Sequence, residues 1–373
     1  MRLLHLLPLA PLASYVSAAA LTAVLAANNA SLSTLSTLLA TVPDVVTMLS
    51  SAQNITILAP SNDAFTKLMA RNPNSAQLMQ NPRLLTGVLQ YHVLSGKIPS
   101  SDFSTTPKFA SSMLTTPFAN VTGGQRVELV KVNNTAMIFS GFKQGSMVSV
   151  ADVMFDGGVV HVVDTVLTVP ATPSDTAVDT GLTSLAGALT AVQLVDAVDA
   201  LSDVTIFAPS NAAFAAIGGG LGALSTQDIT GILGYHVVQG VKFSSDLLQN
   251  GQITLGPTVQ GGNVTVRREN GQLFVNSAKI VLADVLSTNG VVHVIDNVLN
   301  PSNTTATPNP SATTQSPAFG GASAVAEAPF TSGISPTTTF VPATVPLNAA
   351  GGAFAAVPTA ALVLGAAAAM LVV

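Results

Sequence analysis

Histidine is the residue type in this sequence best suited to acid–base chemistry, and four of the five histidines lie in repeated stretches. His92 and His236 each follow a tyrosine, whereas His161 and His293 lie inside the apolar runs VVHVV and VVHVI. The 373-residue chain has no cysteine, which excludes thiolate nucleophiles, disulfides and cysteine-based zinc sites together. A reaction would require one of these rings beside a nucleophile, a carboxylate or a metal ligand.

The apolar residues on both sides of His161 and His293 predict a strand that is buried on both faces. A buried imidazole in such a strand is expected to be neutral and to donate one N–H to a backbone carbonyl. Asp164 would lie on the opposite face of the strand from His161, so the two cannot form a catalytic dyad. We interpret His161 and His293 as supporting the fold, with a functional role as the alternative.

Motifs that would place these histidines in an active site are absent from the sequence. The chain has no G-x-S-x-G elbow, no H-E-x-x-H and no P-loop. Ser61 is better placed as a helix cap, and Gly218-Gly219-Gly220, expected in a loop, lacks the dinucleotide-binding spacing. The sequence therefore predicts no catalytic residue, no cofactor and no metal site. The 13 Lys and Arg residues are scattered, which argues against a nucleic-acid partner.

Three blocks occur twice in the same order and must position these residues. TILAPSNDAF at 56–65 returns as TIFAPSNAAF at 205–214, with eight of ten positions identical. TGVLQYHVLSG at 86–96 returns as TGILGYHVVQG at 230–240, and the block at 151–167 returns at 283–299. Each first block is a strand ended by proline and followed by a capped helix. A repeat of this length indicates two tandem globular domains, with the first copy longer between its second and third blocks.

These ordered blocks resemble the fasciclin domain. The family pattern is a hydrophobic stretch followed by A-P-[ST]-N-x-A-F, then a YH pair, then G-V-V-H-V-[IV]-D. The resemblance covers both copies and implies an α+β fold in which a β-sheet assembly packs against a helical layer. The residues agree with it, because helical periodicity dominates the start of each copy and strand signals dominate the end.

The resemblance also implies which residues form the motif sites. The Tyr91-His92 and Tyr235-His236 region is linked to adhesion in animal members and supports the core through a bond between the histidine and Asp63. The second copy has Ala212 in place of Asp63, so we expect His236 to be less firmly held. A second adhesion-linked position falls on Asp152 and Asp284, which we interpret as turn caps, with a receptor-facing carboxylate as the alternative.

The amino terminus and the sequons predict secretion. Residues 1–20 combine Arg2, an apolar run and small residues, as a signal peptide does. Six asparagines stand in N-x-[ST] and are candidate N-glycosylation sites: Asn29, Asn54, Asn120, Asn133, Asn263 and Asn303.

The carboxyl terminus predicts a stalk and a lipid anchor. Residues 302–348 are rich in Ser, Thr and Pro and read as a disordered, O-glycosylated stalk. Small residues and then an apolar tail at 349–373 resemble a GPI-attachment signal with Asn348 as the attachment residue. A retained membrane anchor is the alternative. Between these ends we predict fasciclin-like domains at 30–170 and 178–301.

These observations together predict a non-enzymatic protein of the cell surface that takes part in adhesion or in contact with matrix or cell wall. Its expected partners are surface, matrix or wall glycans and proteins, including a second copy of the chain, and the membrane through the GPI anchor. The rival interpretation is a secreted module, soluble outside the cell or in a vacuolar lumen. Such a module would bind a lipid or glycan in a cleft between the helical layer and the sheet.

Overall fold

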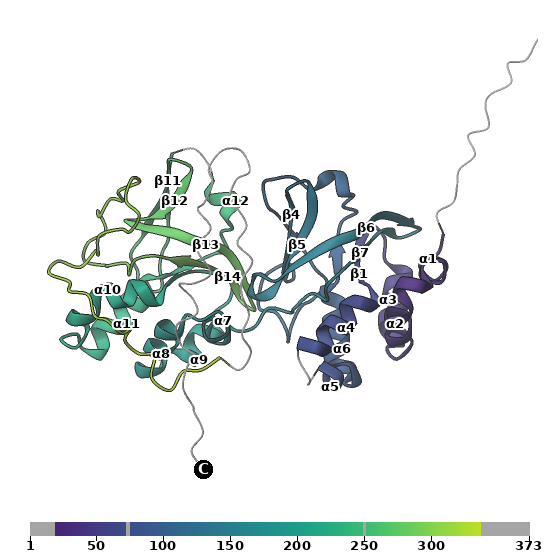
Figure 1. Ribbon diagram of the computed structural model, residues 1–373, viewed down its shortest axis with the longest axis horizontal. Coiled ribbons are helices and arrows are strands. Elements are labelled where there is room, and N and C mark those ends of the chain that lie inside the picture. Colours follow the sequence, from purple (N-terminus) through teal and green to yellow (C-terminus); the bar gives the residue numbers. More distant parts are fainter. Residues whose placement is uncertain (1–18, 72–74, 249–250, 337–373) are drawn as a thin grey trace, which may run out of the picture.

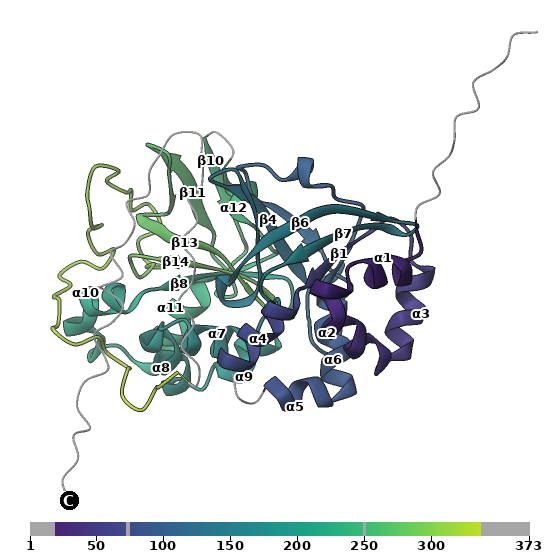
Figure 2. The ribbon, with the colours of Figure 1, turned by 45° about the vertical axis from the view of Figure 1, so that its right-hand side comes forward.

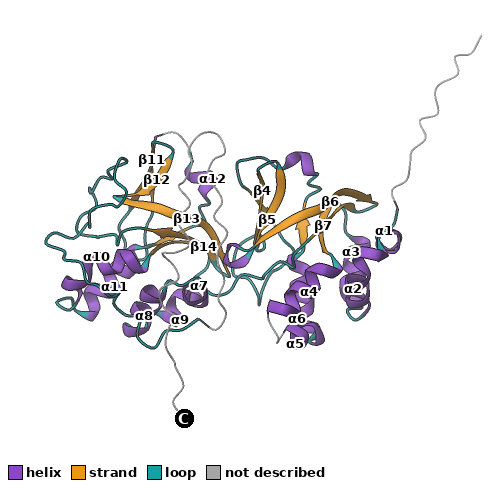
Figure 3. Ribbon diagram, viewed as in Figure 1, coloured by secondary structure: helices purple, strands orange, loops and turns teal. Residues whose placement is uncertain are grey.

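The computed structural model describes residues 19–336, apart from 72–74 and 249–250, and contains two domains of the same architecture (Figure 1). Nearly all of the predicted signal peptide and the predicted attachment residue Asn348 lie outside the described residues. Each domain begins with helices, continues through a strand and further helices, and ends in strands. Figure 3 distinguishes the helices from the strands by colour. The predicted α+β fold is confirmed.

The elements of the first domain follow this order: α1 (Leu21–Ala27), α2 (Asn29–Ala40), α3 (Pro43–Ser51), β1 (Ile55–Pro60), α4 (Asn62–Arg71), α5 (Ser75–Gln80), α6 (Pro82–Tyr91), β2 (Val93–Ser95), η1 (Ser100–Asp102), β3 (Lys108–Ser111), β4 (Arg126–Val132), β5 (Thr135–Phe139), η2 (Gly141–Lys143), β6 (Gly145–Phe155) and β7 (Gly158–Val163). Those of the second domain are α7 (Pro173–Asp179), α8 (Thr183–Ala191), α9 (Val195–Ala200), β8 (Val204–Pro209), α10 (Asn211–Leu221), α11 (Thr226–Tyr235), β9 (Val237–Gln239), α12 (Ser244–Leu247), β10 (Gln252–Leu255), β11 (Val264–Glu269), β12 (Gln272–Val275), β13 (Ala278–Ser287) and β14 (Gly290–Ile295).

Each domain has one seven-stranded sheet, and the repeated blocks form its centre. The order is β2-β1-β7-β6-β5-β4-β3 in the first domain, and the second domain repeats it as β9-β8-β14-β13-β12-β11-β10. β1 and β7 pair in parallel, so that Leu58 lies opposite His161, and β8 pairs with β14 in the same way. All residues of these four strands are buried, because side chains pack against both faces.

The first repeated block also attaches the helical layer to the sheet. The Ser61 hydroxyl accepts a hydrogen bond from the Ala64 amide at 3.2 Å and so caps α4, as predicted. The neighbouring Asn62 reaches across to α2, where its Oδ1 accepts from the Thr34 amide at 2.9 Å. In the second domain Ser210 and Asn211 make the equivalent bonds. The Ser-Asn pair therefore fixes the start of one helix and its contact with another.

The two domains share a polar and aromatic interface, and Figure 2 shows them side by side from a second angle. Phe109 of β3 stacks on Phe243 with the ring centroids 3.8 Å apart. The loop between β3 and β4 supplies Asn120 and Thr122, which bond to the Leu201 carbonyl and the Asp203 carboxylate. This loop is longer than the β10–β11 loop, so the extra residues of the first copy serve the contact between domains.

Residues 302–336 form a strap along the second domain. They contain no helix or strand, but Phe319, Phe330 and Ile334 pack against its helical core. The Val325 amide donates to the Ala215 carbonyl at 2.9 Å, and the yellow-green segment in Figure 1 runs around α10 and past α8. Residues 302–336 are therefore not the disordered stalk that was predicted to start at residue 302, because apolar residues within the Ser/Thr/Pro-rich stretch anchor them to the second domain. The rest of the predicted stalk lies outside the described residues.

Glycines in two helices create the space for this strap. Gly218-Gly219-Gly220 lies inside α10, which corrects the expected loop. A Cβ atom on Gly218 would come within 2.3 Å of a Val325 methyl group, and one on Gly187 of α8 within 1.7 Å of the Phe330 carbonyl oxygen. The glycines cost helix propensity but allow close approach of a second backbone.

We expect Gly187→Ala to displace the strap and to lower the stability of the second domain by about 1–3 kcal/mol, the usual cost of overpacking. Hydrogen exchange or limited proteolysis should then show faster reaction at residues 316–336. Gly220→Ala in α10 is the matched control, because nothing lies within 4 Å of its added Cβ. Equal protection of the strap in both variants would contradict the role assigned to Gly187.

In the part of the chain that the structure describes, no single helix is both long and apolar enough to cross a membrane. α2 and α3 reach that length and composition only when they are taken together, and they meet at a bend of 113°.

Candidate functional site

The Tyr-His pairs connect the helical layer to the sheet. Tyr91 ends α6, and its hydroxyl donates to the Arg126 carbonyl at 2.9 Å. The His92 ring donates from Nδ1 to the Val88 carbonyl at 2.7 Å and accepts at Nε2 from the Leu167 amide at 2.9 Å. Burial lowers the pKa of His92 to about 4, although the bond to Val88 opposes this shift. His92 is therefore a neutral ring with both nitrogens occupied.

The second domain repeats these bonds, and its Tyr235 hydroxyl also accepts from Asn276 Nδ2 at 3.1 Å. His236 lies between the Ile232 carbonyl and the Leu299 amide at 2.7 and 2.9 Å, and burial lowers its pKa to about 4 as well. The Tyr235 hydroxyl donates to the Asn263 carbonyl at 2.7 Å.

The bond between His92 and Asp63 that the resemblance implied is not present. Asp63 is exposed in the first turn of α4, where a carboxylate favours the free N–H groups, and both ring nitrogens of His92 bond to the backbone. The predicted difference between the two copies is therefore wrong, because the bonds to His236 do not depend on the residue at Ala212.

The third repeated block forms a network of serine, aspartate and histidine in each domain. The His161 ring bonds through Nε2 to the Ile98 carbonyl at 2.9 Å, as expected from the sequence, and its Nδ1 accepts from the Asp152 amide at 3.2 Å. The Asp152 carboxylate accepts from both the amide and the hydroxyl of Ser100, and so caps η1. His293, Asp284 and Ser244 repeat all of these contacts, with Nε2 of His293 bonded to the Lys242 carbonyl.

This set contains the residue types of a catalytic triad, but its hydrogen bonds are arranged differently. In a triad the histidine takes the serine proton and the aspartate orients the histidine. Here the serine bonds to the aspartate, and both nitrogens of His161 are occupied by backbone groups. Among the described residues, no three His, Asp or Glu side chains lie close enough together to hold a metal ion. The arrangement can cap turns and hold strands, and it cannot activate a nucleophile.

Ser100 and Ser244 were not predicted from the sequence, although it contains a signal for them. Ser-Ser-Asp occurs at 100–102 and again at 244–246, at the same offset as the Tyr-His pairs. This short fourth repeat marks the partner of each third-block aspartate.

The two aspartates differ in accessibility because of the domain interface. Asp284 is only 1% exposed, since η2 of the first domain packs on β13. Asp152 is exposed, and Met147, Val150 and Met154 of the same strand are each more than 40% exposed. Of these two aspartates, only Asp152 of the first domain is therefore accessible to a binding partner.

A buried ion pair lies beside this interface, and the sequence did not predict it. Lys143 Nζ is 2.5 Å from Glu128 Oε2, with side-chain exposures of 3% and 1%. Burial raises the pKa of Glu128 to about 7; Lys143 opposes that rise, and the Asp284 charge adds to it. Glu128 Oε1 is buried without a hydrogen-bond partner among the described residues. The pair is therefore poorly compensated if either member is lost.

The six sequon asparagines are all exposed, but their side chains are engaged to different degrees. Asn133 lies in the β4–β5 turn with φ of 48°, a position open to a sugar. The Nδ2 atom of Asn120, which would carry the sugar, donates to the Leu201 carbonyl of the second domain at 2.9 Å. Nδ2 of Asn303 likewise donates to the Ala318 carbonyl at 3.0 Å, so Asn120 and Asn303 are the two least suited of the six to be glycosylated.

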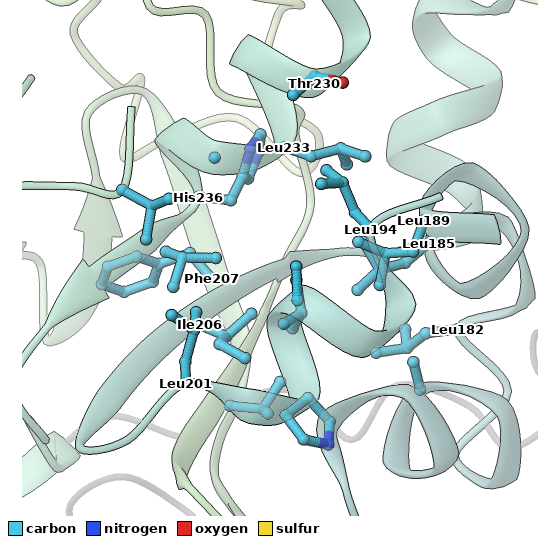
Figure 4. A pocket seen from close by; sticks show the side chains of 18 residues that line it. Leu182, Leu185, Leu189, Leu194, Leu201, Ile206, Phe207, Thr230, Leu233 and His236 are labelled. Atoms are coloured by element: carbon cyan, nitrogen blue, oxygen red, sulfur yellow. The ribbon is translucent and has the colours of Figure 1, made fainter. Parts of the chain in front are cut away.

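The second domain also contains an apolar cavity of about 150 Å³ between its helices and its sheet (Figure 4). Leu185 and Leu189 of α8, Leu233 of α11 and Ile206 of β8 line it. His236 contributes one wall with the ring whose nitrogens are already bonded.

Comparison with known families identifies this architecture. The sequence pattern of the Fasciclin domain matches residues 30–170 and 180–301. The chain belongs to the fasciclin family. The two matched stretches cover the two structural domains apart from their first helices, α1 and α7. Each stretch contains one full set of the histidine, tyrosine and aspartate contacts described above.

Several fasciclin proteins are similar to the chain over most of its length. A fasciclin-like arabinogalactan protein of Arthroderma benhamiae is 35% identical over 307 residues, covering 82% of this chain and 72% of the relative. The fasciclin-like arabinogalactan protein elcF of Phaeosphaeria nodorum is 31% identical over 248 residues, covering 66% and 78%. The solved FAS1 domain pair of the insect cell adhesion molecule Fasciclin I is 18% identical to this chain, with a TM-score of 0.36. The match covers 74% of this chain and 98% of the solved chain.

Proposed function

We propose that this fasciclin protein is a non-enzymatic adhesion protein of the cell surface. The proposal rests on a difference in exposure between the two copies of the network of serine, aspartate and histidine. The domain contact covers Asp284, while Asp152 stays exposed among apolar residues of β6. Of the two copies, only the one around Asp152 in the first domain is therefore accessible to a partner. The four histidines in the described part of the chain are all bonded in ways that support the fold rather than a reaction.

The proposed location is the outer face of the plasma membrane or the cell wall, with a GPI anchor at Asn348 and sugars on exposed sequons. Surface, matrix or wall glycans and proteins, including further copies of the chain, are the proposed partners. Weak contacts gain strength when many copies are displayed at one surface. The strap keeps residues up to 336 on the second domain, so later residues would span the distance to the anchor.

The anchor can be tested by treating intact cells with phosphatidylinositol-specific phospholipase. We expect release of a glycosylated species that shrinks after glycosidase treatment, and an Asn348→Gln variant with Ala349 to Gly351 replaced by bulky residues should not be displayed. Adhesion is tested with beads coated with the purified chain, against beads coated with an Asp152→Ala/Met154→Ser variant. Equal aggregation and cell binding of the two kinds of bead would contradict the proposed surface.

Binding of an apolar ligand between the layers is a second candidate function. The cavity of the second domain favours it, since its walls are almost entirely apolar.

A further inference from the structure

The first domain has a space equivalent to this cavity, but side chains nearly fill it. The equivalent space between helices and sheet in the first domain is about 20 Å³, against about 150 Å³ in the second. Both are lined by the histidine of the Tyr-His pair and by leucines of the second helix of each domain, at Leu35 and Leu39 or at Leu185 and Leu189. The same site is therefore nearly filled in the first domain and empty in the second.

Smaller side chains explain the difference in volume. α1 and α7 open their domains with seven residues each, and both helices contribute their first and fifth residues to the lining. These residues are Leu21 and Leu25 in α1 but Pro173 and Ala177 in α7. Leu49 before β1 is likewise replaced by Val198 before β8. The second domain lacks the leucine side chains that fill this space in the first.

Hydrogen bonds at the rim prevent the helices from closing onto the empty space. The Asp199 carboxylate at the end of α9 accepts from the amide and hydroxyl of Ser174 at the start of α7, at 3.0 and 2.5 Å. The Val198 carbonyl accepts from Asn289 at 2.9 Å, and the Leu201 carbonyl from Asn120 of the first domain. The α9 wall is thus fixed to α7, to the β13–β14 turn and to the neighbouring domain.

The lining selects the chemistry of a ligand. Thr230, at one edge of the cavity in Figure 4, and His236 are its only polar side chains, and both ring nitrogens of His236 are already bonded. A sugar buried there would lose its hydrogen bonds to water without replacement, which disfavours its binding. A dry cavity of this size lined by Leu, Ile and Phe accommodates a molecule such as benzene. Ala197 and Val259 of the lining are exposed and mark the side that opens to solvent.

We infer that the second domain binds a compact apolar molecule, or the apolar end of a larger one, in this cavity, and that the first domain does not. This inference rests on the second of the two proposed functions and is independent of adhesion. It assigns the ligand class as hydrocarbon or aromatic and excludes glycans from the site. The first domain serves as an internal reference, because its leucines already occupy the same space.

The test is calorimetric titration of the full chain with benzene, with mannose as the polar comparison. We expect one benzene site per chain and no binding of mannose. Ala177→Leu and, separately, Val198→Leu place in the second domain the residues of the first. Each should weaken benzene binding roughly tenfold or more, which corresponds to a loss of about 1.4 kcal/mol. Leu25→Ala should add a second site in the first domain.

Near-ultraviolet circular dichroism and thermal melting of each variant, without ligand, establish that it remains folded. Ala177→Leu should melt at a higher temperature than the parent chain, since it fills a void. Unchanged benzene binding in both filling variants would overturn the site, and binding of mannose with the same stoichiometry would overturn the ligand class. Bead aggregation by Ala177→Leu reports on adhesion separately, and we expect it to equal that of the parent chain.

Discussion

Replacing Lys143 by methionine should destabilise the first domain by about 3–5 kcal/mol at pH 8, the usual cost of removing one partner of a buried ion pair. The variant leaves the Glu128 carboxylate buried without its cation, in a place where one of its oxygens already lacks a hydrogen bond. Denaturant unfolding of the full chain followed by tyrosine fluorescence gives the free energy. Because the domain contact lies beside this pair, we also expect weaker coupling between the unfolding of the two domains.

The loss of stability caused by Lys143→Met should become smaller as the pH falls. Burial raises the pKa of Glu128 to about 7, and removing Lys143 removes the cause that opposes this rise. The folded state of the variant therefore takes up a proton on acidification more readily than the unfolded chain, and the loss should be smaller at pH 5 than at pH 8.

Two further variants serve as controls. Glu128→Gln/Lys143→Met removes both charges and should recover most of the stability. Lys67→Met breaks the exposed pair with Asp164, which lies at 3.1 Å with side chains 45% and 30% exposed, and should cost less than about 1 kcal/mol. A Lys143→Met variant no less stable than Lys67→Met at pH 8 would refute the role of the buried pair.

Acidification from pH 6.5 to pH 4 should destabilise both domains through His92 and His236. Their folded pKa is about 4, below the unfolded value of 6.5, because burial penalises the charged ring. Between these values the unfolded chain binds a proton and the folded chain does not, so stability falls as the pH falls. The difference corresponds to roughly 3 kcal/mol for each histidine. Glu128 has the opposite effect on stability between pH 7 and 4.5, because its raised pKa lets the folded chain bind a proton that the unfolded chain does not.

The contribution of the histidines can be isolated by comparing the parent chain with His92→Gln/His236→Gln across this range. The stability of the double variant should lack the downward slope, while the Glu128 contribution stays the same in both proteins. His92→Ala and His236→Ala should cost similar amounts, because each ring makes the same two backbone bonds at the same distances. A slope unaffected by the double replacement would show that other groups govern the acid response.

The sequence predicted the features of this protein that repeat. Two copies of each block located the domains, the central strands and the buried histidines, because strand and helix periodicities are local properties of the chain. Ser100 and Ser244 could have been found in the same way from the repeated Ser-Ser-Asp.

The features that occur once were not predicted, because they depend on residues distant in sequence. Glu128 and Lys143 lie on β4 and η2, and neither pattern nor spacing shows that they meet at a domain boundary. The strap is similar: its Ser, Thr and Pro content indicates no core of its own, and only the partners Gly187 and Gly218 in remote helices show where it lies. The cavity also has no local signal, since it results from what Pro173, Ala177 and Val198 leave unfilled.

The strap determines how the second domain would respond to mechanical load. A pull on the carboxyl end meets Ile334 and Phe330 first, then Val325 and Phe319, so the contacts break in sequence rather than together. Peeling of this kind proceeds at low force. At ~3.3 Å per residue, residues 302–336 could span at most about 115 Å once they are peeled off, before tension reaches β14. The segment would act as an extensible buffer in series with the domains and would take up a sudden pull while both cores remain folded.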